Sequence, residues 1–348
     1  MRPEKALDPD QKLEWPDHHG SIKGAGIVGG FGVMEEAYVR DEVLVAYENR
    51  SEFHIHPETG TVGNGTWWAV GDCRRVGRDY IALELRKLYE GAQFFVIKHY
   101  CDYAVKESSV PVPKNDAEKR NIGIRAREVI NSYLTYLKAI EEICDAAGLS
   151  ATADEIGGLS ESEINYKGWW TFPELGRLGN VAPLTMTYRQ FLARSKDIFA
   201  VFEGLKSGPL RSLLRKLGIP KDQIKEEGLK LSAFLCQLAT IAKKEHWGLI
   251  GDAEEVVKNW DQDARLDFYK PIFALNGLRL ADAHAMSVGN PTAQASNLKV
   301  FDIESDKFKT AGDLRSTVSM TISLNLFRMR RHCFNRFSSR VRSSGRQR

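Results

Sequence analysis

The stretch that decides the fold class is LSAFLCQLATI, residues 231–241. Its large apolar side chains recur at intervals of three or four residues, which places them along one face of an α-helix. These side chains are Leu231, Phe234, Leu235, Leu238 and Ile241. The stretch therefore predicts an amphipathic helix whose apolar face is buried against other helices.

The same spacing occurs on both sides of this stretch. A second apolar stripe consists of Ile124, Val129, Tyr133, Leu137, Ile140 and Ile143. Gly148 is placed to end that helix. Further helices are predicted at about residues 187–205, 209–217 and 264–285. We expect residues 116–305 to form a helical bundle domain.

Nearer the N-terminus the pattern is that of strands. Strands are predicted at residues 42–47, 53–56, 61–62 and 66–70, which are rich in β-forming side chains or alternate in polarity. Residues 57–60, PETG, have the composition of a tight turn. The apolar spacing then becomes helical from Tyr80 to Leu88, and Gly91 is placed to end this helix. Residues 33–107 are therefore predicted to form a small α+β domain.

The remaining segments join or flank these two domains. Residues 1–32 are polar and glycine-rich and are expected to form an extended or loosely packed lead-in. Residues 108–115, SSVPVPKN, contain two prolines and form the predicted linker. Residues 306–348 are expected to be a basic, disordered tail. The predicted fold class is α+β, with a small antiparallel sheet and a helix followed by a mostly α-helical bundle.

Length and composition are those of a globular protein. The chain has 348 residues, enough for two domains, of which 43% are hydrophobic and 27% charged. No run of about 18 apolar residues occurs and the first residues are polar, which argues against a membrane span and a secretory signal. The five cysteines are scattered without a C-x-x-C pair, which is typical of free thiols. We expect a soluble, cytoplasmic protein without membrane association.

The C-terminal tail has an unusual charge pattern. From Ala311 to Arg348 there are nine arginines, no lysine and one acidic residue, Asp313, which leaves 40 basic and 45 acidic side chains in residues 1–310. Arginines interleaved with phenylalanines can neutralise phosphates and stack on bases, so the tail is a candidate nucleic-acid-binding arm. The lack of lysine after a body that contains both residue types favours a disordered segment or one translated out of its ancestral frame.

Two histidines suggest an alternative chemistry. His54 and His56 are two residues apart on a predicted strand, so both imidazoles project from one face. Such a pair can begin a metal site, with Glu58, Asp72 or Cys73 as a third ligand. No third ligand stands at a recognised spacing, and packing histidines are the structural alternative. We expect no metal and no cofactor, and a metal-dependent enzyme using His54 and His56 is kept as an alternative.

Three arginines lie in the segment DCRRVGRD, residues 72–79. The side chains of Arg74, Arg75 and Arg78 can grip phosphate oxygens, which makes them candidate nucleic-acid-binding residues. A solvated helix entry with local ion pairs is the structural alternative.

The segment FALNGLRLADAH, residues 273–284, carries the most specific catalytic candidates. Arg279 and His284 are separated by four residues in an all-helical region. This pattern resembles the R-x4–6-H motif of HEPN-family domains, helical bundles that include metal-independent ribonucleases of toxin and defence systems. The resemblance implies that Arg279 and His284 take part in RNA cleavage, usually at a dimer interface.

The residue types suit this chemistry. Attack by a ribose 2′-hydroxyl needs proton transfer near neutral pH, which His284 can supply, and a cation that stabilises the charged transition state, which Arg279 can supply. Asp282 is a candidate for orienting His284. Five residues along a regular helix place two side chains about 140° apart around its axis. The helix must therefore end or bend between them, or a dimer must complete the site; the structural alternative is a buried Arg–Asp pair beside a helix-terminal histidine.

We therefore predict a HEPN-like protein of a toxin or defence type that cleaves RNA, or binds RNA or nucleotides, without a metal ion. The expected partners are RNA and a second copy of the chain in a homodimer, with a protein partner for the N-terminal domain. The alternative is a non-enzymatic protein-interaction or scaffold protein in which the same residues are structural.

Overall fold

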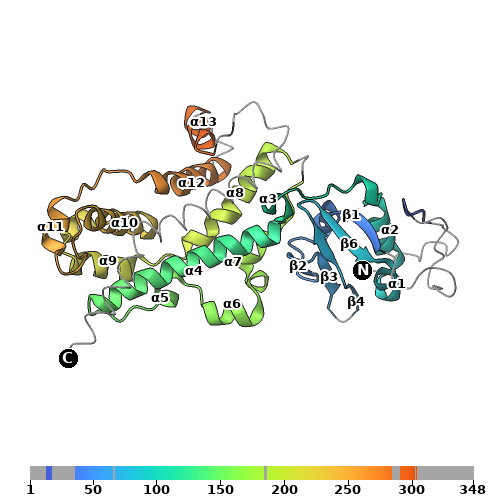
Figure 1. Cartoon of the computed structure of the whole chain (residues 1–348), viewed down its shortest axis with the longest axis horizontal. Helices are drawn as coiled ribbons and strands as arrows, with labels where there is room; N and C mark the ends of the chain where they lie inside the picture. The colour runs from blue at the N-terminus through green and yellow to red at the C-terminus, as the bar shows by residue number, and fades with distance from the viewer. Residues whose placement is uncertain are drawn as a thin grey trace. The chain divides into compact units, whose positions relative to one another are not determined.

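A computed structural model of the chain is shown in Figure 1. It describes residues 13–17, 36–65, 67–183, 186–283, 291–301 and 303. The chain forms two compact units: residues up to 126 with 176–183, and residues 127–175 with those from 184 onward. The segment predicted as a linker, residues 108–115, lies within the first unit.

Two small antiparallel sheets belong to the first unit (Figure 1). One has the order β5-β6-β1-β7 and consists of β1 (Glu36–Arg40), β5 (Arg74–Val76), β6 (Tyr80–Glu84) and β7 (Ala104–Val105). The other has the order β2-β3-β4 and consists of β2 (His54–His56), β3 (Thr61–Asn64) and β4 (Trp68–Val70). The turn predicted at residues 57–60 is confirmed: it joins β2 to β3, with His56 opposite Thr61. The one predicted sheet is in fact two.

The strand predicted at residues 42–47 is wrong. Asp41–Ala46 form a 3-10 helix, η1, and the strand β1 lies immediately before it. Asp41, Val43 and Leu44 are buried, a pattern that follows a helical turn and not the alternation of a strand. The β-branched side chains here pack into the core from a helical turn, because burial outweighs intrinsic strand preference.

The helix predicted from Tyr80 begins only at Leu85. Tyr80–Glu84 form β6, which pairs with both β1 and β5. Its residues Ile81, Ala82 and Leu83 are all buried, so both faces are covered and no alternation marks the segment as a strand. Besides η1, this unit contains α1 (Leu85–Gly91), which ends at Gly91 as predicted, α2 (Phe94–Asp102), η2 (Glu107–Ser109), α3 (Asp116–Lys119), the first residues of α4 (Ile122–Ala146) and η4 (Arg177–Gly179).

Part of the N-terminal lead-in belongs to the core of the first unit. Leu13 and Trp15 are buried among the apolar side chains of the sheets and of α1 and α2. The indole Nε1 of Trp15 donates a hydrogen bond to the hydroxyl of Tyr89, 3.1 Å away. Asp17 accepts a hydrogen bond from the backbone N–H of Glu107 at 2.5 Å. Residues 1–12 and 18–32 of the predicted lead-in, and the predicted tail at residues 306–348, lie outside the described residues.

The described chain from residue 116 onward is mostly helical, as predicted. Its longer helices are α4 (Ile122–Ala146), α8 (Tyr188–Glu203), α9 (Ser207–Lys216), α10 (Gly228–Lys244), α12 (Lys270–Ala283) and α13 (Pro291–Lys299). The shorter ones are α5 (Ala153–Gly157), α6 (Glu161–Lys167), η3 (Trp169–Thr171), α7 (Pro173–Gly176), η4 (Arg177–Gly179), η5 (Lys221–Gln223), α11 (Ala253–Lys258) and η6 (Asp267–Tyr269). None of the helices within the described ranges is long and apolar enough to cross a bilayer.

Two glycines let the helices of the second unit approach closely. A Cβ atom at Gly157 would lie 2.1 Å from Cδ1 of Leu137, and one at Gly204 would lie 2.4 Å from the carbonyl oxygen of Gly157. Any larger residue at either position would push α5 away from α4 or from the end of α8. These contacts position the end of α8 that carries Glu203.

A buried hydroxyl network joins three helical elements of the second unit. The hydroxyls of Tyr136 and Tyr269 are 3.1 Å apart, and Ser232 Oγ lies 2.5 Å from the Tyr269 hydroxyl. We expect Tyr136→Phe to lower the free energy of unfolding by about 0.5–1.5 kcal/mol, because it removes one buried hydrogen bond while Tyr269 keeps Ser232 as a partner. Tyr133 on the same helix is the control, since its buried hydroxyl has no hydrogen-bond partner among the described residues. Tyr133→Phe should cost nothing measurable in urea denaturation, and equal losses for both variants would contradict the network.

Candidate functional site

The helix that carries Arg279, α12, packs against α8 (Figure 1). The guanidinium of Arg279 forms an ion pair with the carboxylate of Glu203, and its Cζ lies 4.7 Å from the ring centroid of Phe199. The side chain is 28% exposed, and its Nε is buried with no hydrogen-bond partner among the described residues. The guanidinium is therefore a positioned, half-buried cation.

The sequence around Arg279 explains this placement. Leu275 and Leu278 are fully buried, while Phe273 and Leu280 are partly exposed, so one face of α12 packs inward. Arg279 follows Leu278 at the edge of that face, where its long aliphatic stem can cover apolar surface while its charged end reaches Glu203. The ion pair and the aromatic contact both stabilise the packing of α12 on α8.

The structure does not describe the side chains that were predicted to act together with Arg279. The side chain of Asp282 and the whole of His284 lie outside the described residues. Their geometry relative to Arg279 stays a prediction, as does their catalytic role.

The three arginines near residue 75 do not form one cationic surface. Arg74 is exposed and pairs with Glu36 at 2.6 Å, and Arg78 pairs with Asp79 at 3.2 Å. The side chain of Arg75 is only 1% exposed. It points into the first unit, so it is not placed to contact a phosphate backbone at the surface.

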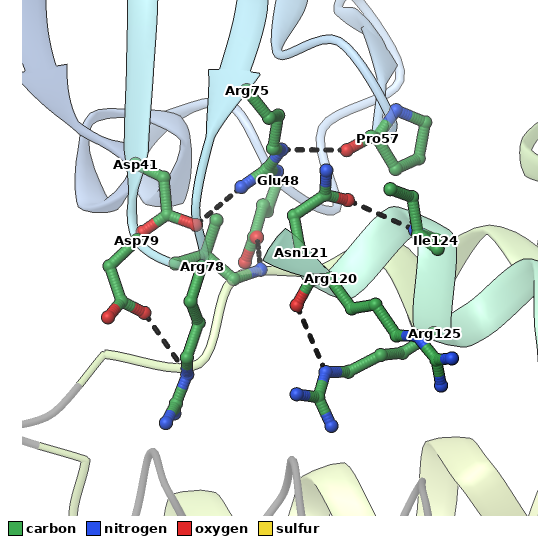
Figure 2. Close-up of polar contacts among 11 residues, drawn as sticks. Asp41, Glu48, Pro57, Arg75, Arg78, Asp79, Arg120, Asn121, Ile124 and Arg125 are labelled. Carbon is green, nitrogen blue, oxygen red and sulfur yellow. Dashed lines mark hydrogen bonds and ion pairs between the residues drawn. The ribbon is translucent and has the colours of Figure 1, made fainter. Parts of the chain in front are cut away.

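Arg75 is the buried centre of a polar cluster, shown in Figure 2. Its Nη1 lies 2.5 Å from Oδ2 of Asp41, and its Nε donates a hydrogen bond to the carbonyl oxygen of Pro57 at 2.8 Å. Its Nη2 is buried without a hydrogen-bond partner among the described residues. One side chain thus links β5 to the start of η1 and to the turn between β2 and β3. We call the following residues the Arg75 cluster: Asp41, Glu48, Arg75, Arg78, Asp79, Arg120, Asn121 and Arg125.

The carboxylates of the Arg75 cluster come from three segments. The backbone N–H of Asp41 donates to the carbonyl oxygen of Asp79 at 2.8 Å, which brings these two acids together. Glu48, just after η1, is buried and accepts a hydrogen bond from the backbone N–H of Val181. Residues 176–183 are thereby held in the first unit, where Val181 joins its apolar core.

The N-terminus of α4 closes another side of the Arg75 cluster (Figure 2). Asn121 caps this helix, because its Oδ1 accepts the backbone N–H of Ile124 at 3.0 Å. Nε of Arg125 donates to the carbonyl oxygen of Arg120 at 3.1 Å. Gly123 lies against the β2–β3 turn so closely that a Cβ atom would be 2.6 Å from the carbonyl carbon of Pro57.

Burial raises the pKa of two acids of the cluster, Asp41 and Asp79. It raises the pKa of Asp41 to about 6 and outweighs the opposing effect of Arg75, with Asp79 and Glu48 adding to the rise. Burial also raises the pKa of Asp79, against the opposing effects of Arg78, Arg75 and Arg125. The cluster therefore holds carboxylates whose ionisation is costly, which is typical of functional sites and of buried ion-pair networks alike.

Sequence reasoning missed the acids of the Arg75 cluster. Arg75 was singled out, but Asp41, Glu48 and Asp79 were not connected with it. A usable signal was the acid Asp41 at the head of an apolar run, since an acid that precedes a core segment needs a buried partner. Nothing in the sequence places that partner on β5.

His54 and His56 lie on a strand, β2, as predicted, with His54 exposed and His56 half-buried. Burial lowers the pKa of His56. Cys73, a proposed third ligand, is buried, which raises the pKa of its thiol to about 12 and makes the thiolate hard to form. Among the residues that the structure describes, no group of three His, Cys, Asp or Glu side chains is placed to hold a metal ion.

Two arrangements can thus carry chemistry: a positioned guanidinium on α12 in the second unit, and a cluster of acids and arginines around the buried Arg75 in the first. The guanidinium of Arg279 can bind an anion if that anion shares it with Glu203. The cluster contains two acids, Asp41 and Asp79, whose ionisation burial opposes. Comparison with protein-family models, curated proteins and solved structures finds no match to the chain.

Proposed function

We propose that the second unit binds RNA and cleaves it without a metal ion, at a site that contains Arg279 and His284 and is completed in a homodimer. The observation that supports this proposal is the position of Arg279, whose guanidinium is held between Phe199 and Glu203 and remains 28% exposed. A cation fixed before binding loses little conformational freedom when a phosphate arrives.

In the proposed reaction Arg279 contacts the scissile phosphate and His284 transfers the proton. The ribose 2′-oxygen forms a bond to phosphorus, the bond from phosphorus to the 5′-oxygen breaks, and the proton passes from the 2′-hydroxyl to the leaving oxygen. The products are a 2′,3′-cyclic phosphate and a 5′-hydroxyl, and no co-reactant is needed. Arg279 stabilises the charge that develops on the phosphate oxygens.

Substitution of Glu203 distinguishes a catalytic role of Arg279 from a structural one. Its carboxylate neutralises Arg279, so a bound phosphate must compete with it. We expect Glu203→Gln to keep cleavage or to tighten RNA binding, while Arg279→Ala should lower cleavage by about 10²-fold or more. The measurement is cleavage of synthetic RNA by the purified full chain in excess chelator, beside the His284→Ala variant and the thermal midpoint of each protein.

The control is Arg194→Ala, which removes another partly buried ion pair from α8, with Asp197 at 3.5 Å. It should leave cleavage unchanged. Absence of chelator-resistant cleavage by the wild type, together with equal losses of thermal stability in Arg279→Ala and Glu203→Gln, would overturn the proposal. Sedimentation of the wild type and of Arg279→Ala tests the expected dimer.

The contacts of Arg279 also favour a second candidate, a non-enzymatic interaction protein in which this side chain only holds α12 on α8. The first unit would then bind a protein partner through Trp67, which is 82% exposed after β3. Exposed tryptophans are frequent anchors of protein interfaces. This candidate predicts that Arg279→Ala lowers the thermal midpoint, and that Trp67→Ala leaves the midpoint unchanged.

A further inference from the structure

Three arginines of the Arg75 cluster form its partly exposed side, which we call the arginine edge. They are Arg78 from the turn between β5 and β6, Arg120 from the residues between α3 and α4, and Arg125 from the first turn of α4. Figure 2 shows their side chains extending away from Arg75. All three residues are partly exposed, so a molecule in solution can reach them.

The acids of the cluster do not balance this side equally. Asp41 is buried against Arg75, and Glu48 is buried and accepts the backbone N–H of Val181. Both carboxylates are therefore committed to the interior. The third acid, Asp79, is 38% exposed and is the one that belongs to the arginine edge.

Asp79 brings two of the arginines together. Its Oδ1 lies 3.2 Å from Nε of Arg78, and its carboxylate also experiences the positive charge of Arg125. Arg125 is held by its own helix end, because its Nε donates to the carbonyl oxygen of Arg120 at 3.1 Å. These guanidinium groups are thus positioned before any ligand binds, which lowers the entropic cost of binding.

The place of these cations on α4 is electrostatically unfavourable. The N-terminal end of a helix carries partial positive charge and is stabilised by acids in its first turn. The first turn of α4, Ile122–Arg125, contains no acidic residue, and Arg120 lies two residues before it. An anion at the arginine edge would relieve this repulsion as well as that between the guanidinium groups.

We propose that Arg78, Arg120 and Arg125 bind the phosphate group of a phosphate monoester. Arginine matches phosphate oxygens in pairs of hydrogen bonds, and three arginines against the single acid Asp79 leave an excess of positive charge. A monoester carries about −1.5 to −2 charges at pH 7, whereas each phosphate of a nucleic-acid backbone carries one. A compact cationic site therefore favours the monoester. The site lies in the first unit and does not depend on the proposed ribonuclease activity.

Titration calorimetry of the full chain tests this site at constant ionic strength. The probes are adenosine 5′-monophosphate, inorganic phosphate and adenosine. We expect saturable binding of the two phosphates and none of adenosine. The ratio of the two affinities shows whether the nucleoside adds to recognition. Arg78→Gln and Arg125→Gln should each weaken binding by about tenfold or more. Asp79→Asn should strengthen it, because this variant removes the carboxylate that competes with the phosphate.

Arg74→Gln is the matched control, since it removes the same charge from the same unit. Arg74 is exposed and pairs with Glu36 at 2.6 Å, so its loss should leave the affinity unchanged. Equal weakening by Arg74→Gln would indicate non-specific attraction and overturn the proposal, as would the absence of saturable binding. Tighter binding of an RNA without terminal phosphates would assign the arginines to a nucleic-acid backbone instead. If Arg125→Gln does not fold, Asp79→Asn decides: unchanged or weaker binding overturns the monoester site.

Discussion

Arg75→Met is expected to lower the free energy of unfolding of the first unit by about 3–5 kcal/mol at pH 7.5, and by much less at pH 5. Methionine can fill much of the space of the buried side chain, but it leaves the Asp41 carboxylate without its 2.5 Å partner and beside Asp79 and Glu48. An aspartate can escape such a position by binding a proton. The pKa of Asp41 should therefore rise further in this variant, and acid should restore stability.

Substitution of the other partner should have a different dependence on pH. Asp41→Asn removes the partner of the buried Arg75 guanidinium, which cannot lose its charge, so acid cannot relieve the loss. We expect this variant to be less stable than the wild type at pH 7.5 and to recover no stability at pH 5. The measurement for both variants is urea denaturation at the two pH values, followed by circular dichroism. An Arg75→Met loss that does not shrink at pH 5 would contradict this account of the cluster.

The helical elements were predictable because their signal is local. The stripe at residues 231–241 is α10, and the stripe from Ile124 to Ile143 is part of α4. Helix starts were also marked locally. The side chain of Thr187 accepts the N–H of Gln190 and completes a capping box at the start of α8. Each of these features needs only residues close in sequence, so one sequence is enough to find them.

The strands were less predictable because their surroundings are set by distant segments. β6 has no alternation since β1 and β5 flank it and other elements cover both of its faces. Residues 42–47 carry strand-forming side chains, yet the chain turns at Asp41. The backbone N–H of Asp41 donates a hydrogen bond to the carbonyl oxygen of Asp79. Such a contact joins positions that no short pattern relates.

In the candidate sites, too, a local pattern predicts some features and distant segments determine the others. Arg279 was found from a local motif, but its contacts with Phe199 and Glu203 come from another helix and could not be inferred. Arg75 was named for its charge and expected to face a phosphate. Its burial follows from the β2–β3 turn and from the N-terminus of α4, which the sequence does not place against β5.

The second large effect is expected at Trp15, in the segment predicted to be loosely packed. Trp15 is 3% exposed, and its Nε1 donates to the Tyr89 hydroxyl at 3.1 Å. Replacing a buried tryptophan by alanine loses its apolar burial and leaves a cavity. We expect Trp15→Ala to lower the free energy of unfolding of the first unit by about 3–5 kcal/mol, measured by urea denaturation and circular dichroism.

Trp67 is the matched control for this loss, because it is the same residue type in the same unit but is 82% exposed. Trp67→Ala should change the free energy of unfolding by less than about 0.5 kcal/mol. A Trp15→Ala variant as stable as Trp67→Ala would mean that residues 13–17 do not dock on the sheets in solution.

Tyr89→Phe separates the two contributions at Trp15, since it removes only the hydrogen-bond acceptor and should cost about 1 kcal/mol. A cost for Tyr89→Phe as large as that for Trp15→Ala would show that the hydrogen bond, and not apolar burial, anchors the segment.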